Sequence, residues 1–258
     1  MIAPADWLRP DWGVDAVGAL MSTRAGGAST GAYRAMNLGS AAGDDPEAVD
    51  ANRRAFSAAL GARPVFLRQV HGTRVVRIGA ADAAPGVPPS EADASVTTEP
   101  GIACTVLAAD CLPVLFAAAD GSAVAAAHAG WRGLAAGVLE RALAAVCDAS
   151  GRPPADIAVW LGACIGPRAF EVGADVLEAM GADPADPPPT RFRPGRPDRW
   201  LADLPGLAAD RLAAAGASRI QRSGACTVES PSRFFSYRRD GVCGRMAAAV
   251  WIRSSGGH

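Results

Sequence analysis

Lysine is absent from this sequence, and all 25 residues that count as Lys or Arg are arginine. Chemistry through a lysine Schiff base is therefore excluded, as is a P-loop whose lysine reaches a nucleotide phosphate. Any anionic group must be bound by arginine, by backbone N–H groups or by a metal ion. The net charge of -1 provides no general attraction for nucleic acids or anionic membranes, so we expect neither as a partner.

Histidine is also scarce, with three residues, of which His258 is the last residue of the chain. A blue-copper centre alone requires two histidines and a cysteine, and additional copper ions require further imidazoles. The two internal histidines, His71 and His128, cannot supply such a set. The sequence therefore excludes the mechanism of a true multicopper oxidase.

Long hydrophobic runs are missing as well. No apolar stretch reaches the length needed to cross a bilayer, and the first residues lack the basic region and apolar run of a secretory signal. We therefore expect a cytoplasmic protein. In a reducing compartment, cysteines are more often buried hydrophobic residues, ligands or nucleophiles than disulfides. The six cysteines are scattered, at positions 104, 111, 147, 164, 226 and 243.

The alternation of apolar runs and helical patterns predicts one α/β domain over residues 1–258, with a mixed β-sheet core covered by helices. Four central runs, DASVTT, IACTVLAAD, LPVLFAAA and AVAAAHAG, are typical of buried strands of one mixed sheet. The Pro-rich residues 181–198 are predicted to form a surface loop. Strands, some with their following turns, are expected at 14–24, 65–70, 73–78, 157–166 and 244–252, and helices at 46–61, 134–149, 171–180 and 201–215.

Three residues are of the types that ligate a metal ion in catalytic sites. His71 in QVHG and His128 in AHAG each lie near the end of an apolar run and close to a glycine. Cys111 lies in ADCLPV between two apolar runs, where Asp110 and Pro113 predict a sharp bend. A cysteine and two histidines that leave one position open are a known zinc set in enzymes. The alternative is that both histidines are structural and Cys111 is a buried core thiol.

Several motifs occur in order along almost the whole chain. They are STRAGGASTGAYRAMNLG (22–39), VHG (70–72), ADC (109–111), AHAGWRG (127–133), LGACIGP (161–167), and CT at 226 followed by SRFFSYRRDG (232–241). On these motifs the chain resembles the bacterial laccase-domain family, also described as multicopper polyphenol oxidase-like or purine nucleoside phosphorylase-type proteins. The resemblance implies an α/β fold similar to that of the catalytic domain of cytotoxic necrotizing factors.

The resemblance also implies that His71, Cys111 and His128 hold zinc and carry the catalysis. It implies phosphorolysis of adenosine, inosine, guanosine and methylthioadenosine, together with deamination of adenosine. The partners would then be purine nucleosides and phosphate. A related member is linked to the editing of peptidoglycan precursors. Copper binds nitrogen and sulfur ligands more tightly than zinc does, so we expect that copper can displace zinc in vitro.

Residues inside the matching motifs are candidates for contacts with substrate. Arg24, Arg132 and Arg238 are candidates for binding phosphate. An equally good interpretation of each is a solvated surface residue or a member of a structural ion pair. Asn37 suits either a hydrogen bond to a base or sugar, or a role within its own loop. Asp110 suits either orienting a metal ligand or capping a turn.

Four further residues have two interpretations each. Glu171 is a candidate general acid, and its position near the start of a predicted helix equally suits capping. Phe234, Phe235 and Tyr237 can stack on a base, although aromatic residues in such a run more often pack in the core.

Three functional hypotheses follow. In the leading one, the chain is a zinc-dependent purine nucleoside phosphorylase that also deaminates adenosine. In the second, Cys111 is the nucleophile of a Cys–His hydrolase and His128 is its base. An amide hydrolase acting on a peptidoglycan precursor fits either mechanism. In the third, the chain is a non-enzymatic metal-binding accessory protein that acts through a partner.

Overall fold

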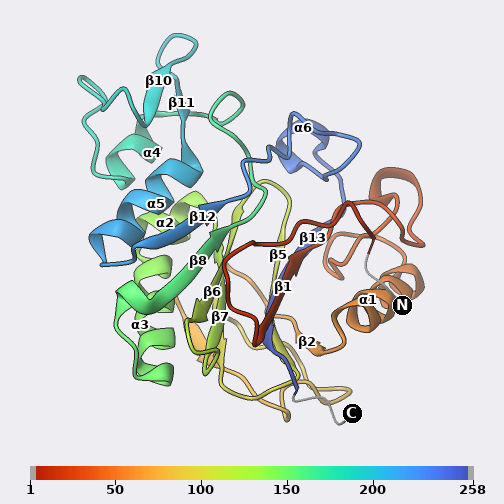
Figure 1. Ribbon diagram of the computed structural model, residues 1–258. Coiled ribbons are helices and arrows are strands. Elements are labelled where there is room, and N and C mark those ends of the chain that lie inside the picture. Colours follow the sequence, from red (N-terminus) through yellow and green to blue (C-terminus); the bar gives the residue numbers. More distant parts are fainter. Residues whose placement is uncertain (1–3, 255–258) are drawn as a thin grey trace.

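Two β-sheets pack face to face in the computed structural model, which describes residues 4–254 (Figure 1). The four-stranded sheet has the order β1-β13-β5-β2, and the six-stranded sheet has the order β12-β8-β6-β7-β4-β3. His258 lies outside the described residues. The strands are β1 (Val17–Met21), β2 (Arg63–Val65), β3 (Val75–Arg77), β4 (Ala94–Thr97), β5 (Ile102–Ala108), β6 (Leu112–Ala118), β7 (Val124–Ala129), β8 (Ile157–Leu161), β12 (Arg219–Arg222) and β13 (Met246–Ile252).

Both sheets are mixed. The pairs β2–β5, β3–β4 and β8–β12 are parallel, and the other pairs are antiparallel. Val106 and Val250 of the four-stranded sheet share one buried cluster with Leu115 and Trp160 of the six-stranded sheet. The predicted α/β class, with a mixed-sheet core covered by helices, is confirmed.

The prediction that the four central runs share one sheet was wrong. β5 belongs to the four-stranded sheet, whereas β4, β6 and β7 belong to the six-stranded sheet. The chain passes from one sheet to the other between β5 and β6, at a bend where Asp110 has a φ of 99°. Because these strands are buried on both faces, their continuous apolar runs do not reveal which sheet each strand joins.

Helices cover the two outer faces of the paired sheets (Figure 1). α3 (Val138–Ser150) and α5 (Leu204–Ala214) pack on the six-stranded sheet, and α1 (Pro46–Leu60) packs on the four-stranded sheet. α1 begins after the capping side chain of Asp45 and ends at Gly61, which has the left-handed conformation. No helix within residues 4–254 is both long and apolar enough to cross a membrane.

The helix predicted at 134–149 is divided in two. α2 (Trp131–Ala135) ends before Gly137, and α3 begins at Val138. Gly137 has a φ of 94°, which residues with a Cβ rarely adopt and which interrupts the helical path. The predicted apolar face is nevertheless buried, and it comprises Leu134, Val138, Leu139, Ala142, Leu143 and Val146.

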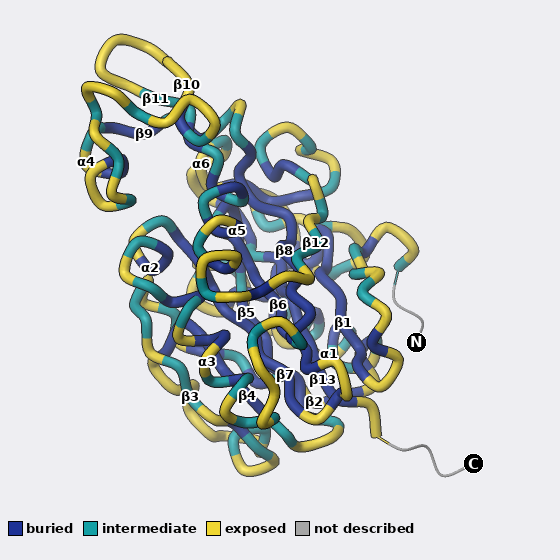
Figure 2. Tube along the Cα trace, turned by 60° about the vertical axis from the view of Figure 1, so that its left-hand side comes forward, coloured by how far each residue is buried: buried dark blue, intermediate teal, exposed yellow. Residues whose placement is uncertain are grey.

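A third, small sheet projects from the body of the molecule, in a region where much of the chain is exposed (Figure 2). Residues 181–198, predicted as a surface loop, are mostly exposed but include one of its strands. Phe192 in that strand is buried in the same cluster as α5. The elements of this region are β9 (Glu171–Val172), α4 (Ala174–Ala179), β10 (Phe192–Pro194) and β11 (Trp200–Ala202).

Candidate metal centre

Three side chains that can ligate a metal meet where the ends of the two sheets adjoin. His71 lies in the connection between β2 and β3, Cys111 in the bend between β5 and β6, and His128 near the end of β7. Their potential ligand atoms all lie within 4.8 Å of one another. Nε2 of His71 is 3.7 Å from Sγ of Cys111, and the two imidazole centroids are 4.8 Å apart. The structure therefore brings the predicted ligands together.

The connection that carries His71 differs from its predicted form. Strands were expected at 65–70 and 73–78, on either side of His71 and Gly72, but β2 and β3 belong to different sheets. His71 has a φ of 60°. The side chain of Gln69 pairs with the backbone of Leu107 in β5, through its Nε2 (2.9 Å) and its Oε1 (2.7 Å). This pairing ties the His71 connection to the four-stranded sheet.

A buried carboxylate, Asp93, fixes two of the ligands. Its Oδ1 accepts hydrogen bonds from Nδ1 of His128 (2.9 Å) and from the backbone N–H of His71 (2.9 Å). Its Oδ2 accepts from the N–H groups of Val70 (3.1 Å) and Gly72 (2.7 Å). Asp93 thus leaves Nε2 of His128 free to face the other ligands. It also ties the backbone at His71 to the six-stranded sheet, because it directly precedes β4.

The bend that carries Cys111 is held by α6 (Tyr237–Asp240) and by the segment before that helix. Asp110 accepts hydrogen bonds from Oγ1 of Thr227 (2.5 Å) and from the backbone N–H of Arg238 (2.6 Å). The predicted sharp bend is confirmed. The side chain of Asp110 anchors the bend to Thr227 and Arg238. Among the described residues, no hydrogen bond connects it to the side chain of a candidate ligand.

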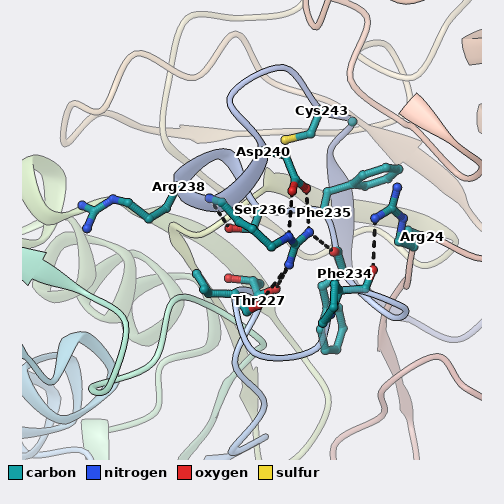
Figure 3. A network of polar contacts seen from close by, with 12 residues as sticks. Arg24, Thr227, Phe234, Phe235, Ser236, Arg238, Asp240 and Cys243 are labelled. Carbon is teal, nitrogen blue, oxygen red and sulfur yellow. Dashed lines mark hydrogen bonds and ion pairs between the residues drawn. The ribbon is translucent and has the colours of Figure 1, made fainter. Parts of the chain in front are cut away.

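A network of polar contacts, to which Arg239 contributes several hydrogen bonds, holds the segment around α6 (Figure 3). The guanidinium of Arg239 donates to the backbone carbonyls of Thr227 (2.8 Å) and Phe234 (3.0 Å). It also forms two hydrogen bonds with the carboxylate of Asp240 (2.7 and 2.6 Å). Much of the SRFFSYRRDG motif therefore has a structural role behind the Cys111 bend.

Two glycines leave room for the ligands. A Cβ at Gly130, just before α2, would lie 2.6 Å from Cδ2 of His71 and 3.1 Å from Sγ of Cys111. A Cβ at Gly133 would lie 2.9 Å from the backbone oxygen of Gly72. The glycines of AHAGWRG therefore allow α2 to approach the metal-ligand cluster closely.

Electrostatics favour the ionised form of the cysteine. Burial by itself raises the pKa of the Cys111 thiol, but the charge of His128 and hydrogen bonds from both histidines lower it to about 6. Burial lowers the pKa of His128, but Cys111 and Asp93 raise it to about 9. Burial also opposes ionisation of Asp93, whose pKa is nevertheless lowered by hydrogen bonds from His128 and the neighbouring backbone. Cys111 is therefore a thiolate near neutral pH.

This donor set is compatible with a metal ion. A thiolate sulfur and two imidazole nitrogens are typical ligands of transition metals. The hydrogen bond from Nδ1 of His128 to Asp93 is the contact that orients a ligating histidine in many metal sites. Among the residues that the structure describes, this is the one group of three or more His, Cys, Asp or Glu side chains arranged to hold a metal.

A cavity of about 800 Å³ opens beside these ligands. His71, Cys111 and His128 line one part of it, and residues 39–42 and 64–69 line much of the rest. Most of its walls are apolar, which is typical of a small-molecule site. The candidate ligands are therefore open to a molecule bound in this cavity.

Two arginines that line the cavity have no carboxylate partner. Arg53 donates to the carbonyl of Leu38 (3.0 Å) and to Oγ of Ser40 (3.3 Å), and burial lowers its pKa. Arg245 donates to backbone carbonyls, the shortest bond being 2.7 Å. Neither forms an ion pair within residues 4–254, whereas Arg68, which also lines the cavity, is paired with Glu91. The charges of Arg53 and Arg245 are therefore not paired with a carboxylate and can attract an anion into the cavity.

The five residues predicted to contact substrate do not line this cavity. Asn37 is fully buried, and its Oδ1 accepts hydrogen bonds from the N–H groups of Gly39 (2.9 Å) and Arg245 (2.8 Å). Its Nδ2 donates to Asp44 (2.9 Å). Asn37 therefore holds its own loop against Arg245, which is the alternative that the sequence left open.

The three arginines predicted to bind phosphate have other contacts. Arg24 donates to two backbone carbonyls and stacks 4.6 Å from the ring centroid of Phe235 (Figure 3). Arg132 stacks 4.4 Å from the ring centroid of Trp131. Arg238 donates to a backbone carbonyl of β9. Their role in binding phosphate stays a prediction, with no cavity contact to support it.

The remaining candidates divide between surface, core and cavity. Glu171 pairs with Arg196 at the surface, away from the cavity lining. Phe234 and Phe235 are fully buried, whereas Tyr237 is 61% exposed and lines the cavity. Of the aromatic run, Tyr237 alone is placed to meet a ligand.

Sequence reasoning missed Asp93, Gln69, Gly130 and the cavity arginines. Asp93 had a usable signal, because an acidic residue directly before a buried strand requires polar partners. Gly130 had a weaker signal, since it follows His128 closely. Nothing in the sequence distinguishes Arg53 from its exposed neighbour Arg54, because helix packing decides which one faces the cavity.

Comparison with known protein families and sequences shows extensive similarity. The family model described as "Multi-copper polyphenol oxidoreductase laccase" matches residues 18–253. A protein named Purine nucleoside phosphorylase PA4543, from Pseudomonas aeruginosa, is 47% identical over 96% of this chain and 98% of its own length. One named Purine nucleoside phosphorylase YfiH, from Escherichia coli, is 46% identical over 92% of this chain and 94% of its own length.

Solved structures have the same fold. Protein NMB0706 of Neisseria meningitidis is 44% identical, with a TM-score of 0.87 over 96% of this chain and 100% of the other. YlmD from Geobacillus stearothermophilus is 30% identical, with a TM-score of 0.87 over 97% of this chain and 100% of the other. The similarity covers both sheets and the elements that carry His71, Cys111 and His128.

Proposed function

The chain belongs to the multi-copper polyphenol oxidoreductase laccase family, and on that premise we propose that it is a zinc-dependent purine nucleoside phosphorylase that also deaminates adenosine. The proposed substrates are adenosine, inosine, guanosine and methylthioadenosine, together with inorganic phosphate. The observation that carries the proposal is the position of His71, Cys111 and His128 on the wall of a cavity that also contains unpaired arginines. The names of two relatives support the purine nucleoside phosphorylase activity.

Zinc suits the donor set. His71, Cys111 and His128 would hold it, and three protein ligands leave one coordination position open, as in catalytic zinc sites. When bound, the ion would supply Lewis-acid chemistry. Two internal histidines do not suffice for the several copper ions of a laccase, so we do not extend an oxidase mechanism to this chain.

Phosphate would be held by Arg53 and Arg245. A partly buried guanidinium without an anionic partner is unfavourable, and a bound phosphate dianion would remove that penalty. Arginine is suited to this role because its N–H groups can form paired hydrogen bonds with phosphate oxygens. These two residues take the place of the three arginines expected from the motifs.

In phosphorolysis, a phosphate oxygen forms a bond to C1′ of the ribose while the bond from C1′ to the purine nitrogen breaks. The base leaves with that electron pair and takes up a proton, and ribose 1-phosphate is formed. The chain's contribution is to hold phosphate and nucleoside together in the cavity. Arg53 and Arg245 would keep the nucleophile in place, and the apolar walls would limit access of water to the reacting atoms.

The proposal is tested by metal analysis and turnover of wild type and Cys111→Ala. Adenosine and inosine are supplied with phosphate, and ribose 1-phosphate, free base and ammonia are followed. We expect about one zinc per wild-type chain, and loss of both zinc and turnover in the variant. Cys147→Ala is the matched control, because Cys147 is a partly buried thiol on α3 outside the cluster. Zinc without nucleoside turnover in the wild type would reject the proposed substrates.

A second candidate is a Cys–His hydrolase, in which Cys111 is the nucleophile and His128 the base. The observation that favours it is the pKa of Cys111 at about 6 together with the buried imidazole of His128, whose pKa is raised to about 9 by Cys111 and Asp93. An amide bond in a peptidoglycan precursor is a suitable substrate class. In this case, turnover persists after the metal is removed with a chelator but is abolished in Cys111→Ala. Loss of turnover on chelation contradicts this candidate.

A further inference from the structure

Tyr237 is an aromatic residue that the fold leaves unpacked at the cavity. It is 61% exposed and lines the cavity, while its sequence neighbours Phe234 and Phe235 are fully buried. Four large hydrophobic residues are exposed within residues 4–254, and the other three are valines. The hydroxyl of Tyr33 donates to a backbone carbonyl (3.0 Å), but no hydrogen bond among the described residues involves the hydroxyl of Tyr237. The hydroxyl therefore lacks a hydrogen-bond partner among the described residues, and most of the side chain is exposed.

The backbone at Tyr237 is fixed although the side chain is free. The N–H of Arg238 donates to Oδ2 of Asp110 (2.6 Å), and the carbonyl of Tyr237 accepts from the N–H of Gly241 (2.8 Å). The Arg239 network holds the residues on both sides of this position (Figure 3). A ring on a fixed backbone loses little conformational freedom when a ligand binds.

Two contacts place Tyr237 near both the candidate metal ligands and the proposed phosphate site, in the lining of the same cavity. Asp110, which accepts the N–H of Arg238, directly precedes Cys111. The guanidinium of Arg245 lies 5.8 Å from the ring centroid of Tyr237, within the range of a cation–π contact. A molecule bound between Cys111 and Arg245 would therefore lie beside Tyr237.

We propose that Tyr237 is the wall of the cavity on which the purine base of the nucleoside stacks. This inference rests on the proposed function and names the part of the substrate that the residue recognises. A purine offers a large planar π face, and stacking on an aromatic ring tolerates different exocyclic groups. Such a contact suits a site that accepts adenosine, inosine and guanosine alike. Tyr237 binds the base and transfers no proton.

The test compares Tyr237→Ala and Tyr237→Phe with the wild-type protein. The readouts are KM and kcat for inosine with phosphate, inhibition by hypoxanthine, inhibition by ribose 1-phosphate, and zinc content. We expect Tyr237→Ala to raise KM for inosine and to weaken hypoxanthine binding roughly tenfold, with a smaller change in kcat. Tyr237→Phe keeps most of the affinity because the ring remains. Val242→Ala is the matched control, since Val242 is also 61% exposed but does not line the cavity.

Three results would overturn the inference. The first is an unchanged KM for inosine in Tyr237→Ala. The second is an equal loss in Tyr237→Phe, which would assign the effect to the hydroxyl. The third is an equal loss of affinity for ribose 1-phosphate, which has no base, because that would indicate a structural effect on the whole cavity.

Failure of the proposed function is distinguishable from failure of this inference. If the wild type does not turn over nucleosides, the proposed function fails. Equilibrium dialysis with hypoxanthine then tests separately whether a purine base stacks on Tyr237. Binding that is lost in Tyr237→Ala and kept in Tyr237→Phe supports the site. Absence of hypoxanthine binding to the wild type overturns it.

Discussion

Oδ1 of Asp93 lies 2.9 Å from Nδ1 of His128 and also accepts the backbone N–H of His71. One buried carboxylate thus sets the orientation of one candidate ligand and the backbone position of another. Its second oxygen is used by two further backbone N–H groups. The candidate metal centre is therefore pre-arranged by a residue that does not belong to the set of candidate ligands.

Asp93→Asn is expected to weaken metal binding. An amide has one acceptor oxygen where the carboxylate has two, and its NH₂ group would face N–H donors. Loss of a carboxylate that orients a ligating histidine typically lowers metal affinity about 10- to 100-fold. Competition with a chromophoric zinc chelator measures this change. Asp120→Asn is the control, because Asp120 pairs with Arg152 at the surface. Equal zinc affinity in both variants and the wild type would contradict the role of Asp93.

Gly130→Ala is expected to abolish metal binding while the protein stays folded. The new Cβ would lie 2.6 Å from Cδ2 of His71, so the ligands must move apart. Zinc content and circular dichroism measure the two effects separately. Gly173→Ala is the control, since Gly173 also precedes a short helix in an extended conformation and faces only the ends of two polar side chains. A Gly130→Ala variant with full zinc content would show that the close approach is unimportant.

In the metal-free protein, Cys111 is expected to be the cysteine that reacts fastest with iodoacetamide near neutral pH. Its pKa of about 6 lies below the ordinary value of 9.0, so the thiolate forms as pH rises through about 6. Burial instead raises the pKa of Cys104 to about 12 and that of Cys164 well above the ordinary value. Mass spectrometry of the alkylated peptides at several pH values checks this. A rate for Cys111 that rises only near pH 9 would refute the prediction.

Asn37→Ala is expected to destabilise the protein without removing the metal. The substitution leaves the buried N–H of Gly39 and the partly buried N–H of Arg245 without their acceptor, and an unpaired buried group costs about 1–3 kcal/mol in the free energy of unfolding. Urea denaturation measures the loss, and zinc content stays at the wild-type level. A raised KM for inosine at unchanged stability would instead support the predicted contact with base or sugar.

Element types could be predicted from the sequence where the signal is local. α1 has a capping aspartate, a proline in its first turn, a terminal glycine, and apolar residues at helical spacing, so its bounds follow almost directly. The division between α2 and α3 was missed because Gly137 interrupts a pattern that otherwise continues on the same buried face. The spacing of apolar residues along the sequence gives no indication that one glycine adopts a positive φ.

Sheet membership could not be predicted in the same way. β5 and β6 are both continuous apolar runs, and a strand buried on both faces has no alternation to show which sheet it faces. The cavity likewise depends on which sheet each strand joins, because it lies between segments that only the packing of two sheets brings together. For this reason the sequence did not indicate that Arg53 and Arg245 line the cavity whereas the arginines of the motifs, Arg24, Arg132 and Arg238, do not.

The sequence by itself determined the chemical inventory. With no lysine, it restricted anion binding to arginine, backbone or metal. With two internal histidines, it made His71, Cys111 and His128 candidate metal ligands, which the family resemblance also implies. Only the tertiary structure decided how these groups are used. It places their ligand atoms within 4.8 Å of one another. It also brings Asp93 into contact with Nδ1 of His128 and with the backbone N–H of His71. The reason is that residue types are local properties of the chain, whereas distances between residues far apart in sequence depend on how the sheets pack.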